Sequence, residues 1–328
     1  MAAAPSLDHA VRDLVGYGAA PPHARWPHGA RLALSFVVNY EEGAEHTLLN
    51  GDAGPERFLT EGGATAAASS GMRSLGVESG YAYGAQRGFW RILHLFHTHA
   101  VPFTSWAVGR AVELNPHVVP AMEAARGEVA CHSQRWIDYA AMPEAEERQH
   151  VAQALDALAA ASPSGRVPRG WYTGRQSLQT RRIVYEEYRR RGLLATLYDS
   201  DAYDEDLPYW VPCPSPEPGP PLLVVPYTLD CNDMKFAQAP GFVTAGQMYE
   251  YLVDAFDTLY AEGEEGSPKM MTVGLHCRVI GRPGRFPALR RFVEYVKQKE
   301  QVWIATREEI AEHWRREHPP KEGQWHEV

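Results

Sequence analysis

Two kinds of segment, which differ in their pattern of apolar and polar positions, alternate along this chain. The first kind is short and continuously apolar, as in Leu32-Ala-Leu-Ser-Phe-Val-Val38, which predicts a strand buried on both faces. The second kind repeats its apolar residues at helical spacing, as at Phe89, Ile92 and Phe96, which predicts one buried helix face. The two kinds succeed one another to the end of the chain, which predicts repeated strand and helix units.

The same pattern predicts further elements after the opening strand. The expected strands are 102–108, 128–131, 166–172, 194–199, 222–226, 270–275 and 302–305. The expected helices begin near 86 and cover 116–125, 143–160, 179–191, 245–261, 287–299 and 307–316, with Gly127 ending the second of them. About seven or eight strands separated by crossovers predict an α/β fold, a distorted, closed or nearly closed (β/α) barrel of parallel strands.

The barrel is expected to occupy most of the chain, with a short segment at either end. Residues 1–30, rich in Ala, Pro, His and Gly, predict an N-terminal arm packed on the surface or on a neighbouring subunit. The catalytic barrel follows over 31–318, and 319–328 form a C-terminal tail. Small and polar residues predict a flexible insertion over about 62–80.

Composition and charge narrow the kinds of partner. The 328 residues are 45% hydrophobic, enough for a sizeable core, and carry a formal net charge of -9 with a pI near 5.9. Without a basic face we expect no nucleic-acid or membrane partner, and a small-molecule substrate is favoured. The N-terminal residues lack a signal-peptide pattern and no apolar run is long enough to span a membrane, which predicts a cytoplasmic enzyme. The four cysteines lack Cys-x-x-Cys spacing and are expected to be free thiols.

Ionisable and hydrogen-bonding side chains follow five of the predicted strands. In a parallel barrel the C-terminal strand ends meet at one mouth, where active sites lie. The residues expected there are Glu41, Glu42, His132, Tyr172, Arg175, Asp199, Asp201, His276 and Arg278. Two adjacent carboxylates at the end of a buried strand need partners, although a solvated acidic turn is the alternative interpretation of Glu41 and Glu42. Acid, base and cationic groups converging on one mouth predict an active site.

The order of these segments resembles that of the polysaccharide deacetylase family, the NodB-homology domain, from about 31 to 314. Asn39-Tyr40-Glu41-Glu42-Gly43 is similar to the family's Thr-Phe-Asp-Asp-Gly motif, so Glu41 matches the catalytic base and Glu42 the metal-binding acid. The family's His-Ser-x-x-His motif matches 132–136, and its Leu-x-His motif, which holds the catalytic acid, matches Gly274-Leu275-His276. Two further motifs are approximated by Arg169-Gly170-Trp171-Tyr172 and by Asp199-Ser200-Asp201.

One departure from the family changes the expected chemistry. Trp136 stands where the family has its second metal-ligand histidine, which leaves Glu42 and His132 at matching positions. A catalytic zinc needs about three protein ligands and an open position. We therefore expect no metal and no other cofactor. A site that relies on fixed donors suits a more activated carbonyl than a sugar acetamide.

This combination resembles one branch of the family, the metal-independent PuuE-type allantoinases. Segments that carry the resemblance include Leu49-Asn50-Gly51-Asp52, Val225-Pro226-Tyr227-Thr228-Leu229-Asp230, Asn232-Asp233-Met234 and Gly281-Arg282-Pro283-Gly284-Arg285. The resemblance implies hydrolysis of the hydantoin ring of allantoin to allantoate, in purine catabolism, by a homo-oligomer. Residues 62–79 and the cysteine before His132 depart from the branch.

Ring opening needs a base for water, a stabiliser for the oxyanion and an acid for the leaving nitrogen. We expect Glu41 to be the base and His276 the acid, with Asp199 or Asp201 holding the histidine in the required tautomer. His132 is expected to polarise the carbonyl, contact the substrate or bridge Glu42.

Substrate contacts are expected from further residues around the mouth, namely Glu42, His132, Arg135, Trp136, Trp171, Tyr172, Arg175 and Arg278. The two tryptophans suit the walls of a flat ring, with core packing as the alternative. The three arginines suit ureido or ring carbonyls, with surface salt bridges as the alternative. Other functions left open are a cyclic imide or other hydantoin hydrolase, a metal-dependent deacetylase, and a non-catalytic carbohydrate-binding relic, against which the retention of Glu41 and His276 argues.

Overall fold

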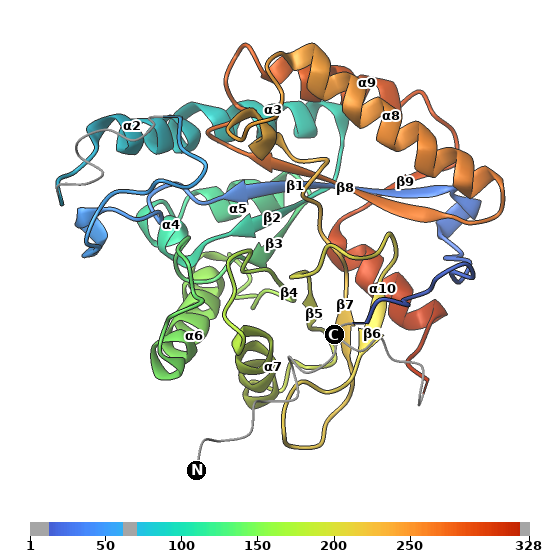
Figure 1. The fold of residues 1–328 in the computed structure, drawn as a ribbon, viewed down its shortest axis with the longest axis horizontal. Coiled ribbons are helices and arrows are strands. Elements are labelled where there is room, and N and C mark those ends of the chain that lie inside the picture. The colour runs from blue at the N-terminus through green and yellow to red at the C-terminus, as the bar shows by residue number, and fades with distance from the viewer. Residues whose placement is uncertain (1–12, 62–70, 322–328) are drawn as a thin grey trace.

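The opening apolar run forms β1, Leu32–Tyr40, which is buried at every position. The computed structural model describes residues 13–61 and 71–321. β1 pairs in parallel with β8 (Lys269–His276) along one edge, and with β9 (Val302–Ile304) and then β2 (Phe103–Ala107) along the other. It is therefore hydrogen-bonded along both edges, although it stands next to last in the strand order (Figure 1).

The sheet contains nine strands within the described residues, in the order β6-β7-β5-β4-β3-β2-β1-β8, with β9 beside β1. The remaining strands are β3 (Gly127–Cys131), β4 (Gly170–Trp171), β5 (Tyr198–Asp199), β6 (Tyr209–Val211) and β7 (Leu222–Val224). Every strand pair is parallel except β6 with β7, an antiparallel pair that the sequence did not predict. An isolated bridge from Asn232 to Gly274 brings the chain after β7 beside β8. The predicted α/β fold with a mostly parallel sheet is confirmed.

Helices cover both faces of the sheet, with α10 packed on the face opposite to the others. They are α2 (Leu75–Tyr83), the π-helical segment η4 (Gly84–Gly88), α3 (Phe89–His99), α4 (Gly109–Leu114), α5 (Val118–Ala124), α6 (Glu144–Ala161), α7 (Thr180–Arg190), α8 (Ala245–Glu264), α9 (Phe286–Val296) and α10 (Arg307–Glu317). Short 3₁₀ turns are η2 (Pro27–Gly29), η3 (Leu48–Asn50) and η5 (Asp233–Phe236). In Figure 1, α8 and α9 lie together above β8, and α6 and α7 lie together beside β3 and β4. None of the helices in the described residues is long and apolar enough to cross a membrane.

Side chains of β1 alternate between two buried clusters. Leu34, Phe36 and Val38 pack on the outer face against the helices, whereas Ala33 and Val37 belong to an inner cluster. Successive side chains of a strand point to opposite faces, so both faces of β1 are dry. The inner cluster includes α10, which begins at a capping box of Thr306 and Glu309.

Part of the predicted N-terminal arm lies in this inner cluster rather than on the surface. Trp26 is buried, packs against Trp303 and Trp314, and donates its indole N–H to the carbonyl of Lys269. The expectation of a peripheral arm is therefore wrong for Ala24, Trp26 and Ala30, which are buried in the inner cluster, whereas Arg25 and His28 between them are exposed.

Two local predictions also need correction. The expected insertion at 62–80 includes residues 62–70, which lie outside the described part of the chain, but from Leu75 onward the segment forms α2. The turn before β3 is made by Arg126, with a φ of 65°, and Gly127 is the first residue of the strand. A Cβ at Gly127 would lie 2.5 Å from the ring of Phe103, so glycine is required there by close approach rather than as a helix cap.

Candidate active site

The ends of β1, β3 and β8 bring three ionisable side chains together. Val37 projects to the inner face of the sheet, and because side chains alternate along a strand, Asn39 and Glu41 project to that face too. By the same alternation, Glu42 projects to the outer face. His132 directly follows β3, and His276 is the last residue of β8, paired in register with Asn39. The predicted convergence of Glu41, His132 and His276 at one edge of the sheet is present.

Glu41 is fully buried and is surrounded by three cationic or imidazole groups. Its Oε1 lies 3.4 Å from Nε2 of His132 and 3.4 Å from Nε2 of His276. Its Oε2 accepts a hydrogen bond of 2.5 Å from Nη1 of Arg278. Burial alone would raise the pKa of Glu41, but the charges of Arg278 and then His276 hold this pKa well below its usual value. Glu41 is therefore an ionised carboxylate in a dry site, and the acidic-turn interpretation does not apply to it.

His276 is oriented by Asp233, from the start of η5. Asp233 Oδ1 lies 2.6 Å from Nδ1 of the imidazole, and Oδ2 accepts the backbone N–H groups of His276 at 2.8 Å and Ile280 at 2.9 Å. Burial lowers the pKa of His276, but Glu41 and Asp233 outweigh it and raise this pKa to about 9. At neutral pH the ring is an imidazolium that holds a proton on the nitrogen facing Glu41.

His132 has a different tautomeric arrangement. Its Nδ1 lies 3.0 Å from the backbone carbonyl of Tyr172, an acceptor, so Nδ1 carries a proton there. Nε2, the other ring nitrogen, faces Glu41. The ring of Tyr172 packs 4.9 Å from that of His132, and its hydroxyl shares a hydrogen bond of 2.8 Å with the hydroxyl of Tyr203. Tyr172 is therefore part of the wall behind His132.

Arg278 lies between two aromatic rings. Its guanidinium carbon is 4.3 Å from the ring centroid of Tyr81 and 4.7 Å from that of Trp136. The other large cation near Trp136 is Arg175, at 4.3 Å from the same ring. Trp136 is thus a buried ring that contacts two guanidinium groups, which fixes Arg278 against Glu41.

Asp199, Asp201 and Trp171, all predicted for the site, lie elsewhere. Trp171 belongs to the outer cluster and pairs in register with Asp199, which faces Arg181 of α7 at 3.6 Å. Asp201 accepts backbone N–H groups from the loop after β4, and burial together with Asp199 raises its pKa to about 7. The expectation that Asp199 or Asp201 orients His276 is wrong, because Asp233 occupies that position while Asp199 faces α7 and Asp201 binds the loop after β4. Trp171 is a core residue.

Arg135 and Arg175 hold loops together. Arg135 donates to the carbonyls of Ala44 and Glu45 and lies 2.5 Å from a carboxylate oxygen of Asp52. Arg175 donates to the carbonyl of Trp136. Arg135, expected to contact substrate, instead makes hydrogen bonds that fix the loop after β1. Arg175 contacts both the ring and the backbone carbonyl of Trp136.

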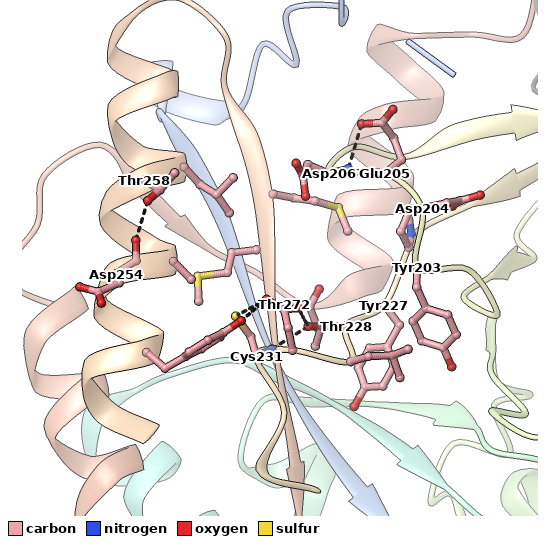
Figure 2. A pocket seen from close by; sticks show the side chains of 18 residues that line it. Tyr203, Asp204, Glu205, Asp206, Tyr227, Thr228, Cys231, Asp254, Thr258 and Thr272 are labelled. Carbon is pink, nitrogen blue, oxygen red and sulfur yellow. Dashed lines mark hydrogen bonds between the residues drawn. The ribbon is translucent and has the colours of Figure 1, made fainter. Parts of the chain in front are cut away.

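A separate cavity of about 750 Å³ lies where the segment after β7 approaches β8 (Figure 2). Figure 2 shows Tyr203, Asp204, Glu205 and Asp206 on one side and Asp254 and Thr258 of α8 on the other. Tyr227 is shared with the strand-end site, because its hydroxyl accepts a hydrogen bond of 3.0 Å from Asn39. None of Glu41, His132 and His276 lines this cavity, so the acid and base groups define a different site.

Comparison with known proteins shows which family the chain belongs to. A profile of polysaccharide deacetylase sequences matches residues 70–187. A Schizosaccharomyces pombe protein named for the same family is 51% identical over 317 residues, covering 95% of this chain and 99% of its own length. This chain belongs to the polysaccharide deacetylase family. It is accordingly a hydrolase of that family.

Two solved structures share both the sequence and the fold of this family member. A Pseudomonas aeruginosa structure named for polysaccharide deacetylases is 50% identical with a TM-score of 0.87, covering 94% of this chain and 99% of that one. The crystal structure of PuuE allantoinase is 51% identical with a TM-score of 0.86 over the same shares of the two chains.

The residues of this deacetylase-family site do not fit the metal that the family implies. Trp136 stands at the position of a ligand, and Glu42 points away from His132 toward Gly84, where an added Cβ would lie 2.2 Å from Glu42 Oε1. Burial raises the pKa of Glu42 to about 7. Within residues 13–61 and 71–321, no three His, Cys, Asp or Glu side chains are grouped to hold a metal ion. The expected bridge from His132 to Glu42 is wrong, since His132 faces Glu41.

Two residues of the site were missed from the sequence. Asp233 belongs to one of the segments that resemble the allantoinase branch, but no role was assigned to it because it follows no predicted strand. Tyr81 directly follows the segment predicted to be a flexible insertion. The sequence signal that could have indicated Tyr81 was an aromatic residue shortly before the helix predicted from about residue 86.

Proposed function

We propose that this chain opens the hydantoin ring of allantoin to give allantoate, without a metal. The observation that carries the proposal is the position of Glu41 Oε1, 3.4 Å from both imidazole Nε2 atoms. A water between these groups and a cyclic amide would contact Glu41 as the base, His132 as a hydrogen-bond acceptor and His276 as the acid. The 51% identity to PuuE allantoinase over nearly the whole of both chains supports the choice of substrate.

Glu41 acts as the general base. Its carboxylate takes a proton from water as the water oxygen attacks the ring carbonyl carbon, and His132 Nε2 orients the second water hydrogen. The attack produces a tetrahedral carbon with a negatively charged oxygen. The imidazolium of His276 and the guanidinium of Arg278 behind Glu41 offset this charge in a site from which bulk water is excluded.

His276 acts as the general acid. The C–N bond of the ring breaks as the proton on Nε2 passes to the leaving nitrogen, which yields a carboxylic acid and an open ureido chain. The carboxylic acid then ionises, and the proton held by Glu41 returns to His276 Nε2. Asp233 keeps the other ring nitrogen protonated and stabilises the charged form before this step. Water is added across one C–N bond, and no electron transfer is needed.

The test is a hydrolysis assay on protein treated with a chelator and freed of metal. We expect allantoin to be opened at the same rate before and after chelation, and Glu41→Gln to lower kcat by about a thousandfold or more, the upper range for loss of a general base. Glu144→Gln, on an exposed helix start, is the matched control and should retain the full rate.

Two further substrates separate this proposal from its alternatives. Hydrolysis of succinimide but not allantoin would assign the site to simpler cyclic imides. Deacetylation of chitin oligomers that is lost on chelation and returns with zinc would assign it to the metal-dependent chemistry of the family. Either result contradicts the proposal.

A further inference from the structure

Three hydrogen-bond donors close to Glu41 are buried and have no acceptor among the described residues. They are the Tyr81 hydroxyl and the Nε and Nη2 atoms of Arg278. The opposite corner of the same guanidinium, Nη1, is occupied by Glu41. A buried donor without a partner destabilises the fold, so a cluster of three points to an acceptor that the site is built to receive.

The arrangement of this donor cluster is fixed rather than incidental. The ring of Tyr81 stacks on the guanidinium at 4.3 Å, and Trp136 contacts the same group at 4.7 Å. Burial raises the pKa of Tyr81 well above its usual value, so the hydroxyl keeps its proton and can donate it to a hydrogen bond. Tyr81 lies in the last turn of α2, just before the π-helical segment η4, whose Gly84 packs against Glu42.

The position of the donor cluster does not suit the carbonyl under attack. That carbonyl must face Glu41 Oε1 and the two histidines, whereas the free edge of Arg278 is the one turned away from its Nη1 contact with Glu41. The donor cluster therefore suits a second carbonyl group of the substrate. Carboxyl groups of Glu45 and Glu56 interact electrostatically with the Tyr81 hydroxyl, which disfavours an anionic acceptor.

We propose that Tyr81 and the free edge of Arg278 form a specificity site that binds the exocyclic ureido group of the substrate. A ureido group is planar and neutral, and it offers one carbonyl oxygen to the three donors. The flat side of Trp136 completes the subsite. This inference rests on the proposed function, because it assigns the part of allantoin that a bare hydantoin ring lacks.

The test compares allantoin with hydantoin in Tyr81→Phe, which keeps the stacked ring and removes the hydroxyl. We expect KM for allantoin to rise about tenfold, the loss of one hydrogen bond, with kcat within about threefold of the wild type. The KM for hydantoin, or its inhibition constant against allantoin where it is not turned over, should stay within about twofold. Tyr83→Phe, on the same helix with its hydroxyl near Gly281, is the matched control and should leave both values unchanged.

The outcomes separate the inference from the proposed function. A wild-type protein that opens allantoin, with a Tyr81→Phe variant whose KM is unchanged or rises equally for hydantoin, overturns the ureido site alone. If both kcat and the thermal unfolding midpoint of Tyr81→Phe fall, Tyr81 has a structural role, and this result also overturns the ureido site. A wild-type protein that opens no cyclic amide overturns the proposed function, and the ureido site with it.

Discussion

Asp233 holds His276 at both the ring and the backbone: its Oδ1 lies 2.6 Å from Nδ1, and its Oδ2 accepts the N–H of the same residue at 2.8 Å. The first contact stabilises the charged imidazole, and the second fixes the end of β8 from which the ring projects. Asp233 thus sets the position of the proposed acid and, together with Glu41, its protonation. Such coupling makes the pH dependence of the reaction a direct readout of the site.

The rate should fall on the alkaline side as His276 loses its proton. The pKa of His276 is raised from 6.5 to about 9, so the acid form persists through neutral pH. We expect kcat/KM for allantoin to decrease as the pH rises through about 9. Protonated His276 also stabilises the fold; this contribution is fully present below about pH 6.5 and is lost as the pH rises through about 9. A pH–rate profile and urea unfolding across that range measure both effects, and an alkaline limb near 6.5 would contradict them.

Removing the orienting carboxylate should move this limb. In Asp233→Asn one of the two charges that raise the pKa of His276 is absent, so the alkaline limb should shift to lower pH by about one unit or more. We also expect kcat to fall about tenfold to a hundredfold, because the ring is no longer held in one tautomer. Asp199→Asn is the comparison variant, and its alkaline limb should not move. A shift of that limb would show that Asp199 influences His276.

The part of the site that sequence could predict is the part that strand geometry alone determines. Glu41, His132 and His276 stand at the ends of strands whose apolar runs are readable, and parallel strands place such ends together. The same alternation explains why Glu41 and Glu42 have different surroundings. The fold class followed from the order of strands and helices for the same reason.

The residues that sequence misplaced depend on contacts made across long stretches of chain. Asp199 shares a strand end with the site, but its register with Trp171 puts it on the outer face, and a two-residue strand gives too little pattern to read that phase. Asp233 reaches His276 from a 3₁₀ turn, and Tyr81 reaches Arg278 from a helix outside the sheet. Neither approach leaves a periodic signal in the sequence.

Replacing Arg278 should disturb both the charge of Glu41 and the stability of the fold. In Arg278→Met the largest lowering influence on the pKa of Glu41 is removed, so the acid limb of kcat/KM should move to higher pH. Loss of one partner of a buried ion pair should also lower the free energy of unfolding by about 3–5 kcal/mol. Denaturant unfolding and a pH–rate profile measure the two effects.

A second variant covers the case in which Arg278→Met fails to fold. Arg278→Lys keeps the charge near Glu41 but loses the planar group stacked between Tyr81 and Trp136. We expect its acid limb to stay closer to that of the wild type while KM for allantoin rises. An acid limb that moves equally in both variants would show that the charge of Arg278 does not control Glu41.

The last prediction separates stability from catalysis. Arg307, at the start of α10, is fully buried inside the barrel and donates to the carbonyls of Val225 and Pro226 and to the hydroxyls of Ser200 and Thr272. It joins β5, β8 and the chain after β7 from within, and no carboxylate among the described residues forms an ion pair with it.

Arg307→Met removes a buried charge but leaves several buried acceptors without donors, each worth about 1–3 kcal/mol. The first effect offsets part of the second, so we expect the free energy of unfolding to fall by about 2–4 kcal/mol in urea, with kcat for allantoin unchanged well below the unfolding temperature. Arg307→Lys should recover part of the loss, because an ammonium group can reach some of the same acceptors. Unchanged stability in Arg307→Met would mean that the barrel interior adapts to the loss, whereas a fall in kcat at full stability would place Arg307 in the electrostatics of the active site.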